Sequence, residues 1–232
     1  MNALANLELT GHAKNGDAGL YARIENLIIA GWTGRDQPAM EAHIVELEEL
    51  GIARPKSTPI FYRVAASLLT TAEAIEVPGD DSSGEVETIV LSLDDGLWVG
   101  VGSDHTDRKI EAVNVTASKQ MCAKPIGRDL WPYAEIEDHW DQLILRSFAT
   151  VGGARRLYQE GPAATMRPPG ELMRLYTGSD ASLAPGSAMF GGTLAVAGGI
   201  APAEKFEIEL HDPVLGRTIG HSYAIRTLPV EG

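Results

Sequence analysis

The sequence predicts a β-rich α+β fold, in which a strand-rich region follows a small N-terminal α/β cap. From residue 59 onward, short segments rich in β-branched residues alternate with Gly, Asp and Pro turns, as in VETIVLSL (86–93). Before that point, one long segment has the start and periodicity of an α-helix. We therefore predict a cap over residues 1–55 and a larger β-rich domain over 56–232.

The cap is expected to contain two strands and one helix. The strands are predicted on either side of a polar loop (11–19), at 4–9 and 26–32. The helix is predicted over 36–52, because Asp36 suits its N-cap and Gly51 its C-terminal end.

Three further elements are predicted in the second domain. A strand hairpin should close at the glycine pair 152–153, and prolines should open a short helix over 168–176. The alternating segment 205–226 should form a final hairpin that turns between Asp212 and Gly216.

Charge and cysteine content exclude several classes of protein. The 232 residues include 32 acids and 19 bases, a net charge of −13, which argues against nucleic acid and anionic membranes as partners. The single cysteine, Cys122, excludes an internal disulfide framework and a cysteine-based zinc site. The N-terminus lacks the pattern of a signal peptide, and the uncharged stretch 181–203 is interrupted by prolines and glycine pairs. A cytoplasmic protein with no membrane span is expected.

An acidic cluster is the main candidate for a functional site. Glu85 and Glu87 are two residues apart, so on a strand they share one face, and Asp104 follows a predicted strand end. Carboxylates are the hard oxygen ligands that Mg²⁺ and Mn²⁺ prefer, although a solvated strand face carries the same pattern. His105 and Asp107 add acid–base options beside it, and a histidine flanked by acids is also common on surfaces.

Two other segments suggest a ligand site. Lys119 stands among small and apolar residues, where an ammonium needs an anionic partner unless it reaches solvent. Paired glycines around Thr193, including Gly192, allow a ligand to approach the backbone closely, or mark a crowded strand crossing.

The order of these motifs resembles the fumarylacetoacetate hydrolase superfamily, most closely a bacterial DUF2848-like branch, over about residues 55–228. The matching segments are PIFYR (59–63), EVE (85–87), SDHTDR (103–108), SKQMCAKPIG (118–127), QEGPAATM (159–166) and PGSAMFGGTLAVAGG (185–199). The resemblance implies a mixed β-roll or barrel fold, and relatives are commonly homodimers.

The resemblance also implies roles for individual residues. Glu85, Glu87 and Asp104 match the ligands of a Mg²⁺ or Mn²⁺ ion, and Lys119 matches a lysine that contacts substrate beside the metal. The expected contacts to a small oxo-acid substrate are Arg63, Lys119, Gln159, Gly192 and Thr193. The interval from Glu87 to Asp104 is shorter than usual in the family, which leaves Asp107 as an alternative ligand.

The implied function is a metal-dependent hydrolase or lyase that cleaves a C–C bond in a small 2-oxo or β-keto acid through a stabilised enolate. His105 is the first candidate for the general base and Lys119 the second, while His12 could close over the site. The alternatives are a hydratase, dehydratase, decarboxylase or isomerase using the same metal site, and a metal-dependent small-molecule binding protein.

Overall fold

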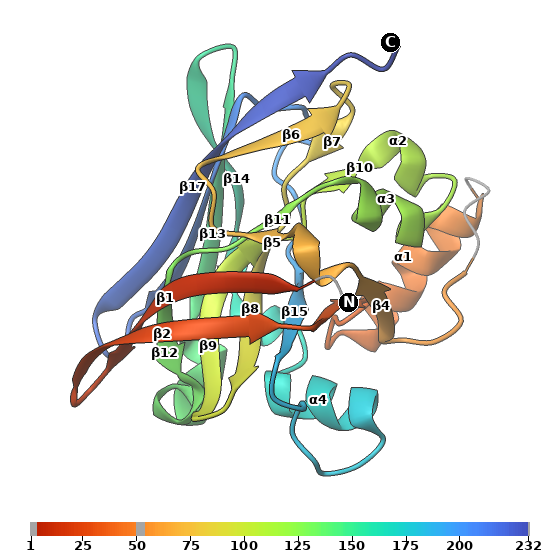
Figure 1. Cartoon of the computed structure of the whole chain (residues 1–232). Helices are drawn as coiled ribbons and strands as arrows, with labels where there is room; N and C mark the ends of the chain where they lie inside the picture. The colour runs from red at the N-terminus through yellow and green to blue at the C-terminus, as the bar shows by residue number, and fades with distance from the viewer. Residues whose placement is uncertain (1–3, 50–53, 232) are drawn as a thin grey trace.

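Two large β-sheets dominate the computed structural model, which describes residues 4–49 and 54–231 (Figure 1). The larger sheet has eight strands in the order β2-β1-β12-β9-β8-β15-β3-β4, and the smaller has five in the order β14-β13-β16-β17-β6. With few helices beside these sheets, the predicted β-rich α+β class is confirmed.

The strands of the larger sheet are β1 (Ala5–Ala13), β2 (Gly16–Ile24), β3 (Asn26–Gly31), β4 (Ile60–Val64), β8 (Val86–Leu93), β9 (Gly96–Ser103), β12 (Asp129–Pro132) and β15 (Ser187–Thr193). Those of the smaller sheet are β6 (Ala74–Pro78), β13 (Ile144–Val151), β14 (Ala154–Pro162), β16 (Lys205–Asp212) and β17 (Arg217–Leu228). Two short ladders pair β5 (Leu69–Thr70) with β11 (Lys124–Pro125), and β7 (Ser82–Ser83) with β10 (Thr106–Asp107).

The α-helices are α1 (Gln37–Glu49), α2 (Arg108–Glu111), α3 (Val115–Met121) and α4 (Pro169–Thr177). Helices α1, α2 and α3 gather on one side of the molecule in Figure 1. None of the helices in the described ranges combines the length and the apolar character needed to cross a bilayer.

The N-terminal strands are longer than predicted. The expected loop at 11–19 is wrong, because β1 and β2 pair along their whole lengths around a turn at Lys14 and Asn15. Gly16 has φ +126° and follows Asn15, so this dipeptide supports a tight turn, and polar residues then occupy paired strand ends. Strand β3 pairs with β15 within the larger sheet, and a domain division near residue 55 stays a prediction.

The helix and hairpin predictions agree with the structure elsewhere. The amide of Ala39 donates to Asp36 Oδ1 at 3.0 Å, which confirms the N-cap of α1, while Gly51 lies outside the described residues. The hairpin β13–β14 closes at glycines 152 and 153, whose φ values of +58° and +75° suit the tight turn. The predicted helix at 168–176 is α4, and the final hairpin is β16–β17.

Strand β8 separates two hydrophobic cores. Val86 and Val90 face the core between the two sheets, to which Phe206 of β16 also belongs. Ile89 and Leu91 face a second core that the larger sheet encloses with its other face. Glu87 has the same parity as Ile89 and Leu91, and it therefore points to an interior face of the larger sheet.

Candidate metal centre

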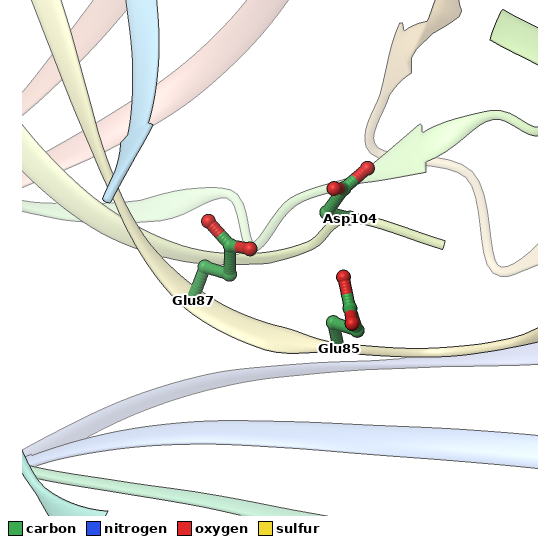
Figure 2. Close-up of side chains that lie close together, drawn as sticks. All are labelled: Glu85, Glu87 and Asp104. Atoms are coloured by element: carbon green, nitrogen blue, oxygen red, sulfur yellow. The ribbon is translucent and has the colours of Figure 1, made fainter. Parts of the chain in front are cut away.

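The β8–β9 pair brings three carboxylates together. Glu85, Glu87 and Asp104 each offer an oxygen, and these atoms all lie within 4.8 Å of one another (Figure 2). Glu85 precedes β8 and Asp104 follows β9, and the amide of Asp104 donates to the carbonyl of Glu85 at 3.0 Å. The cluster is thus a consequence of antiparallel register, in which Glu87 lies opposite Gly102.

Glu87 is a buried carboxylate with little compensation. Its side chain is 2% exposed, and its Oε2 accepts a hydrogen bond of 2.7 Å from the amide of Gly192. Within the described ranges, no Lys, Arg or His nitrogen forms an ion pair with it. Burial raises its pKa well above the ordinary value, and the negative charges of Asp104 and Glu85 raise it further. This carboxylate requires either a proton or a cation.

Asp104 has the opposite balance, because two lysines surround it. Lys119 donates to its Oδ2, and Lys124 Nζ lies 3.0 Å from its Oδ1. Burial opposes ionisation, but the two ammonium groups outweigh it and lower the pKa of Asp104 to about 2. Asp104 is therefore ionised throughout the physiological range.

Glu85 forms ion pairs with two cations at the edge of the cluster. Arg108 Nη1 lies 3.0 Å from Glu85 Oε1 and also donates to Glu111 at 2.8 Å. Lys119 Nζ lies 3.7 Å from Glu85 Oε2. Around the three carboxylates, these contacts leave Glu87 as the uncompensated member, and hard carboxylate oxygens at this spacing fit a divalent cation such as Mg²⁺ or Mn²⁺.

Lys119 reaches the cluster from α3. Asn114 caps that helix by accepting from the amide of Ala117 at 2.9 Å. The ammonium also lies 5.8 Å from the ring centre of Tyr62, within the range of a cation–π contact. The predicted position of Lys119 beside the acidic cluster agrees with this geometry, and Tyr62 is a neighbour that the sequence did not single out.

Gln159, Gly192 and Thr193 lie around the cluster as supports. The buried Gln159 Oε1 accepts from the amide of Val86 at 3.0 Å, and its Nε2 donates to Thr193 Oγ1 at 2.8 Å and to the carbonyl of Leu194. These hydrogen bonds occupy the side-chain amide of Gln159 and link β14 to β8 and β15. This geometry supports a structural role for Gln159, and it offers no free amide for the predicted contact with substrate.

Gly192 provides a sharp test of the backbone at this site. It has φ +95°, and a Cβ built on it would lie 1.9 Å from Thr33 Oγ1. We expect Gly192→Ala to lower the free energy of unfolding by at least about 2 kcal/mol, because both the conformation and the space exclude a side chain. Urea denaturation measures this, with Gly19→Ala on β2, where nothing lies within 4 Å of an added Cβ, as the control. Equal stability of the two variants would contradict the tight fit.

The structure does not present His105 as a general base. Its Nδ1 contacts Tyr223 Oη at 3.0 Å and its Nε2 contacts Ser82 Oγ at 2.9 Å, in a fully buried position. Burial, followed by the charges of Lys124 and Arg108, lowers its pKa to about 3. The ring is a neutral, doubly hydrogen-bonded part of the interior, and it has no free nitrogen for a substrate.

Three other sequence expectations are corrected. Arg63 is exposed on β4 and donates to Tyr176 Oη and Asn26 Oδ1, on the strand face opposite to Tyr62, so alternation turns it away from Lys119. Asp107 is the N-cap of α2, where it accepts from the amide of Ile110, and among the described residues Asp104, not Asp107, completes the cluster with Glu85 and Glu87. His12 lies on β1 with its ring between Asp17 and Asp129, at 2.8 Å from each, and does not form a lid in this structure.

Lys124, Arg108 and Tyr62 are the neighbours of the cluster that sequence reasoning missed. Lys124 and Arg108 stand inside the matched motifs 118–127 and 103–108, and Tyr62 stands one residue before Arg63. A second lysine in an otherwise small and apolar segment was the available signal for Lys124, because a buried ammonium needs an anionic partner.

Comparisons with known proteins agree with this architecture. The family profile described as "Protein of unknown function (DUF2848)" matches residues 30–223. A search of curated proteins found no match.

Several solved structures are similar at low sequence identity. A Yersinia pestis CO92 protein described as belonging to the fumarylacetoacetate hydrolase family is 20% identical, with a TM-score of 0.61 over 92% of this chain and 99% of that one. A yeast fumarylacetoacetate hydrolase family protein is 17% identical, with a TM-score of 0.62 over 88% of this chain and 94% of that one. A 2-keto-3-deoxy-D-arabinonate dehydratase complexed with magnesium and 2,5-dioxopentanoate is 17% identical, with a TM-score of 0.61 over 88% of this chain and 73% of that one. The chain therefore shares their fold.

Proposed function

Because the chain belongs to the DUF2848 family and has the fold of fumarylacetoacetate hydrolase family proteins, we propose that it is a divalent-metal-dependent enzyme acting on a small oxo acid. The observation that carries the proposal is the buried Glu87 carboxylate, which lies beside Asp104 and Glu85 and forms no ion pair with any residue that the structure describes. A buried anion of this kind is costly unless a cation or a proton neutralises it.

Glu85, Glu87 and Asp104 are the proposed ligands of a Mg²⁺ or Mn²⁺ ion. When bound, the ion supplies Lewis-acid stabilisation of negative charge on a substrate oxygen, as in an enolate. The amide of Gly192 holds one oxygen of Glu87, which orients the carboxylate toward the cluster.

Lys119 is the proposed contact for the carboxylate or enolate oxygen of the substrate. Its ammonium lies at the cluster beside the ring of Tyr62, where an anionic ligand would meet it. Glu85, Glu87, Asp104 and Glu111 face Lys119, Lys124 and Arg108, four acids against three cations, so a bound dication leaves a net positive site that suits an anionic oxo acid.

His105 is engaged, which leaves Lys119 as the second candidate for moving a proton. Burial favours its neutral amine, but the charges of Asp104 and Glu85 outweigh burial and raise its pKa, so that in this arrangement Lys119 can hold or donate a proton and cannot take one.

The first candidate reaction is cleavage of a C–C bond in a 2-oxo or β-keto acid. Dehydration of a 2-oxo sugar acid is the second, and the shared fold with the magnesium-containing dehydratase favours it. A metal-dependent binding protein without turnover is the alternative from another class. The oxo-acid ligand and a homodimeric assembly are both part of this proposal.

The test combines metal binding with turnover. EDTA-treated protein is titrated with Mn²⁺ and Mg²⁺ by calorimetry, and is then screened against acylpyruvates, β-keto acids and 2-oxo-3-deoxy sugar acids. We expect metal-dependent turnover of at least one class, its loss in Glu87→Gln, and its retention in the control Glu8→Gln, which alters an exposed acid on β1. Metal binding without any turnover would favour the binding protein, and the absence of metal binding would overturn the proposal.

A further inference from the structure

The ammonium of Lys119 lies between two carboxylates of the acidic cluster. Its ammonium contacts Asp104 Oδ2 and also lies 3.7 Å from Glu85 Oε2. Both oxygens belong to carboxylates of the proposed metal site, and the positive charge therefore lies between two of its three ligands.

We propose that Lys119 is a placeholder cation, whose ammonium neutralises Asp104 and Glu85 in the metal-free protein and withdraws from between them when a divalent cation binds. The inference rests on the proposed metal site and adds a competition between the ion and a side chain of the protein. A dication and an ammonium between the same two carboxylates repel each other strongly in a buried site. Withdrawal also frees the ammonium for an anionic substrate at the moment when the site becomes able to bind one.

Lys124 explains why Asp104 can lose its contact with Lys119. Lys124 is completely buried, with Nζ 3.0 Å from Asp104 Oδ1 and a hydrogen bond of 2.5 Å to the carbonyl of His105. Because Lys124 hydrogen-bonds the carbonyl of His105 and forms an ion pair with the carboxylate of Asp104, its contact with Asp104 does not depend on Lys119. Lys124 is thus a positioning residue on the oxygen that Lys119 does not use.

Lys119 has the contacts that a movable cation needs. It retains 6% exposure, whereas Lys124 has none, and its ammonium also borders the ring of Tyr62. The aromatic face offers a second favourable environment for the ammonium. In the part of the chain that the structure describes, no backbone carbonyl accepts a hydrogen bond from Lys119 Nζ, in contrast to Lys124.

The test measures metal affinity and does not depend on turnover. The Mn²⁺ dissociation constant is determined by calorimetry for wild type, Lys119→Met, Lys119→Arg and Lys124→Met. Removing the competing charge in Lys119→Met is expected to tighten Mn²⁺ binding by about tenfold, equivalent to about 1.4 kcal/mol. Lys119→Arg is expected to weaken it, because a planar guanidinium bridges carboxylates more firmly than an ammonium.

Lys124→Met is the matched control, because it removes the same charge from the other oxygen of Asp104. It is expected not to tighten Mn²⁺ binding, since Asp104 loses the ammonium that ties its carboxylate to the carbonyl of His105. If this variant does not fold, the opposite signs expected for Lys119→Met and Lys119→Arg still decide the matter.

The outcomes separate the two proposals. Mn²⁺ binding by the wild type with unchanged or weaker binding by Lys119→Met would overturn the placeholder role and leave the metal site standing. Equal tightening in Lys119→Met and Lys124→Met would also overturn it, because net charge alone would then explain the change. Failure of the wild type to bind Mn²⁺ or Mg²⁺ would overturn the proposed function and this inference with it.

Discussion

Asp104→Asn is expected to lower the free energy of unfolding of the metal-free protein by about 3–5 kcal/mol, the cost of removing one partner of a buried ion pair. The substitution leaves two buried ammonium groups, those of Lys119 and Lys124, without their main counter-charge. Urea denaturation in EDTA at pH 7 measures the loss.

Asp107→Asn is the control for this change, because asparagine also caps helices well and Asp107 caps α2. We expect the control to stay close to the wild type. A similar loss in both variants, or a negligible loss in Asp104→Asn, would contradict the ion-pair geometry.

The carboxylate of Asp104 also makes the stability of the protein depend on pH. The folded protein holds the pKa of Asp104 at about 2, below its ordinary value of 3.8. The lowered pKa contributes stability that is fully present above about pH 4 and is lost as the pH falls through about 2. Unfolding free energies between pH 5 and pH 2 should therefore fall less steeply in Asp104→Asn than in the wild type.

The effect of Glu87→Gln on the free energy of unfolding is expected to change sign between metal-free and metal-containing solution. In EDTA at pH 8 the variant should be more stable than the wild type, because it removes a buried carboxyl group whose ionisation is opposed by burial and by the negative charges of Asp104 and Glu85. In Mn²⁺ at one hundred times the wild-type dissociation constant, the wild type should gain about 2.7 kcal/mol and the variant almost nothing. Thermal and urea unfolding under both conditions measure the crossing.

The sign of the pH dependence follows from the direction of the shift. The pKa of Glu87 is raised in the metal-free fold, so its contribution is favourable below the ordinary pKa of 4.5 and is lost as the pH rises through the raised value. The stability advantage of Glu87→Gln in EDTA should consequently grow with pH. A variant that is less stable than the wild type in EDTA at every pH would show that Glu87 is already compensated.

Much of the site was predictable because it depends on local regularities. Glu85 and Glu87 are two residues apart where β8 begins, and the β8–β9 hairpin returns Asp104 to the same end. The prediction for Lys119 followed from its matched motif, and the structure brings its ammonium to the cluster.

The errors concern the direction in which single side chains point. Arg63 and Tyr62 are adjacent on β4, and the edge pairing of β4 with β3 decides which of them faces Lys119. His105 follows Asp104 directly, yet its ring turns to Tyr223 on β17, a strand more than one hundred residues away in the sequence.

Strand alternation, turn residues and caps act over a few neighbouring residues, so the sequence alone predicted the β-rich class, helices α1 and α4, the hairpins β13–β14 and β16–β17, and the pairing of Glu85 with Glu87. It missed the β1–β2 hairpin and left Asp104 and Asp107 as alternatives. The three-dimensional arrangement was needed to show that Lys124 pairs with Asp104 in the interior, that hydrogen bonds occupy the amide of Gln159, and that Glu87 has no ion pair among the described residues. These features depend on which distant groups share a dry interior, where burial and charge pairing set the protonation of each group.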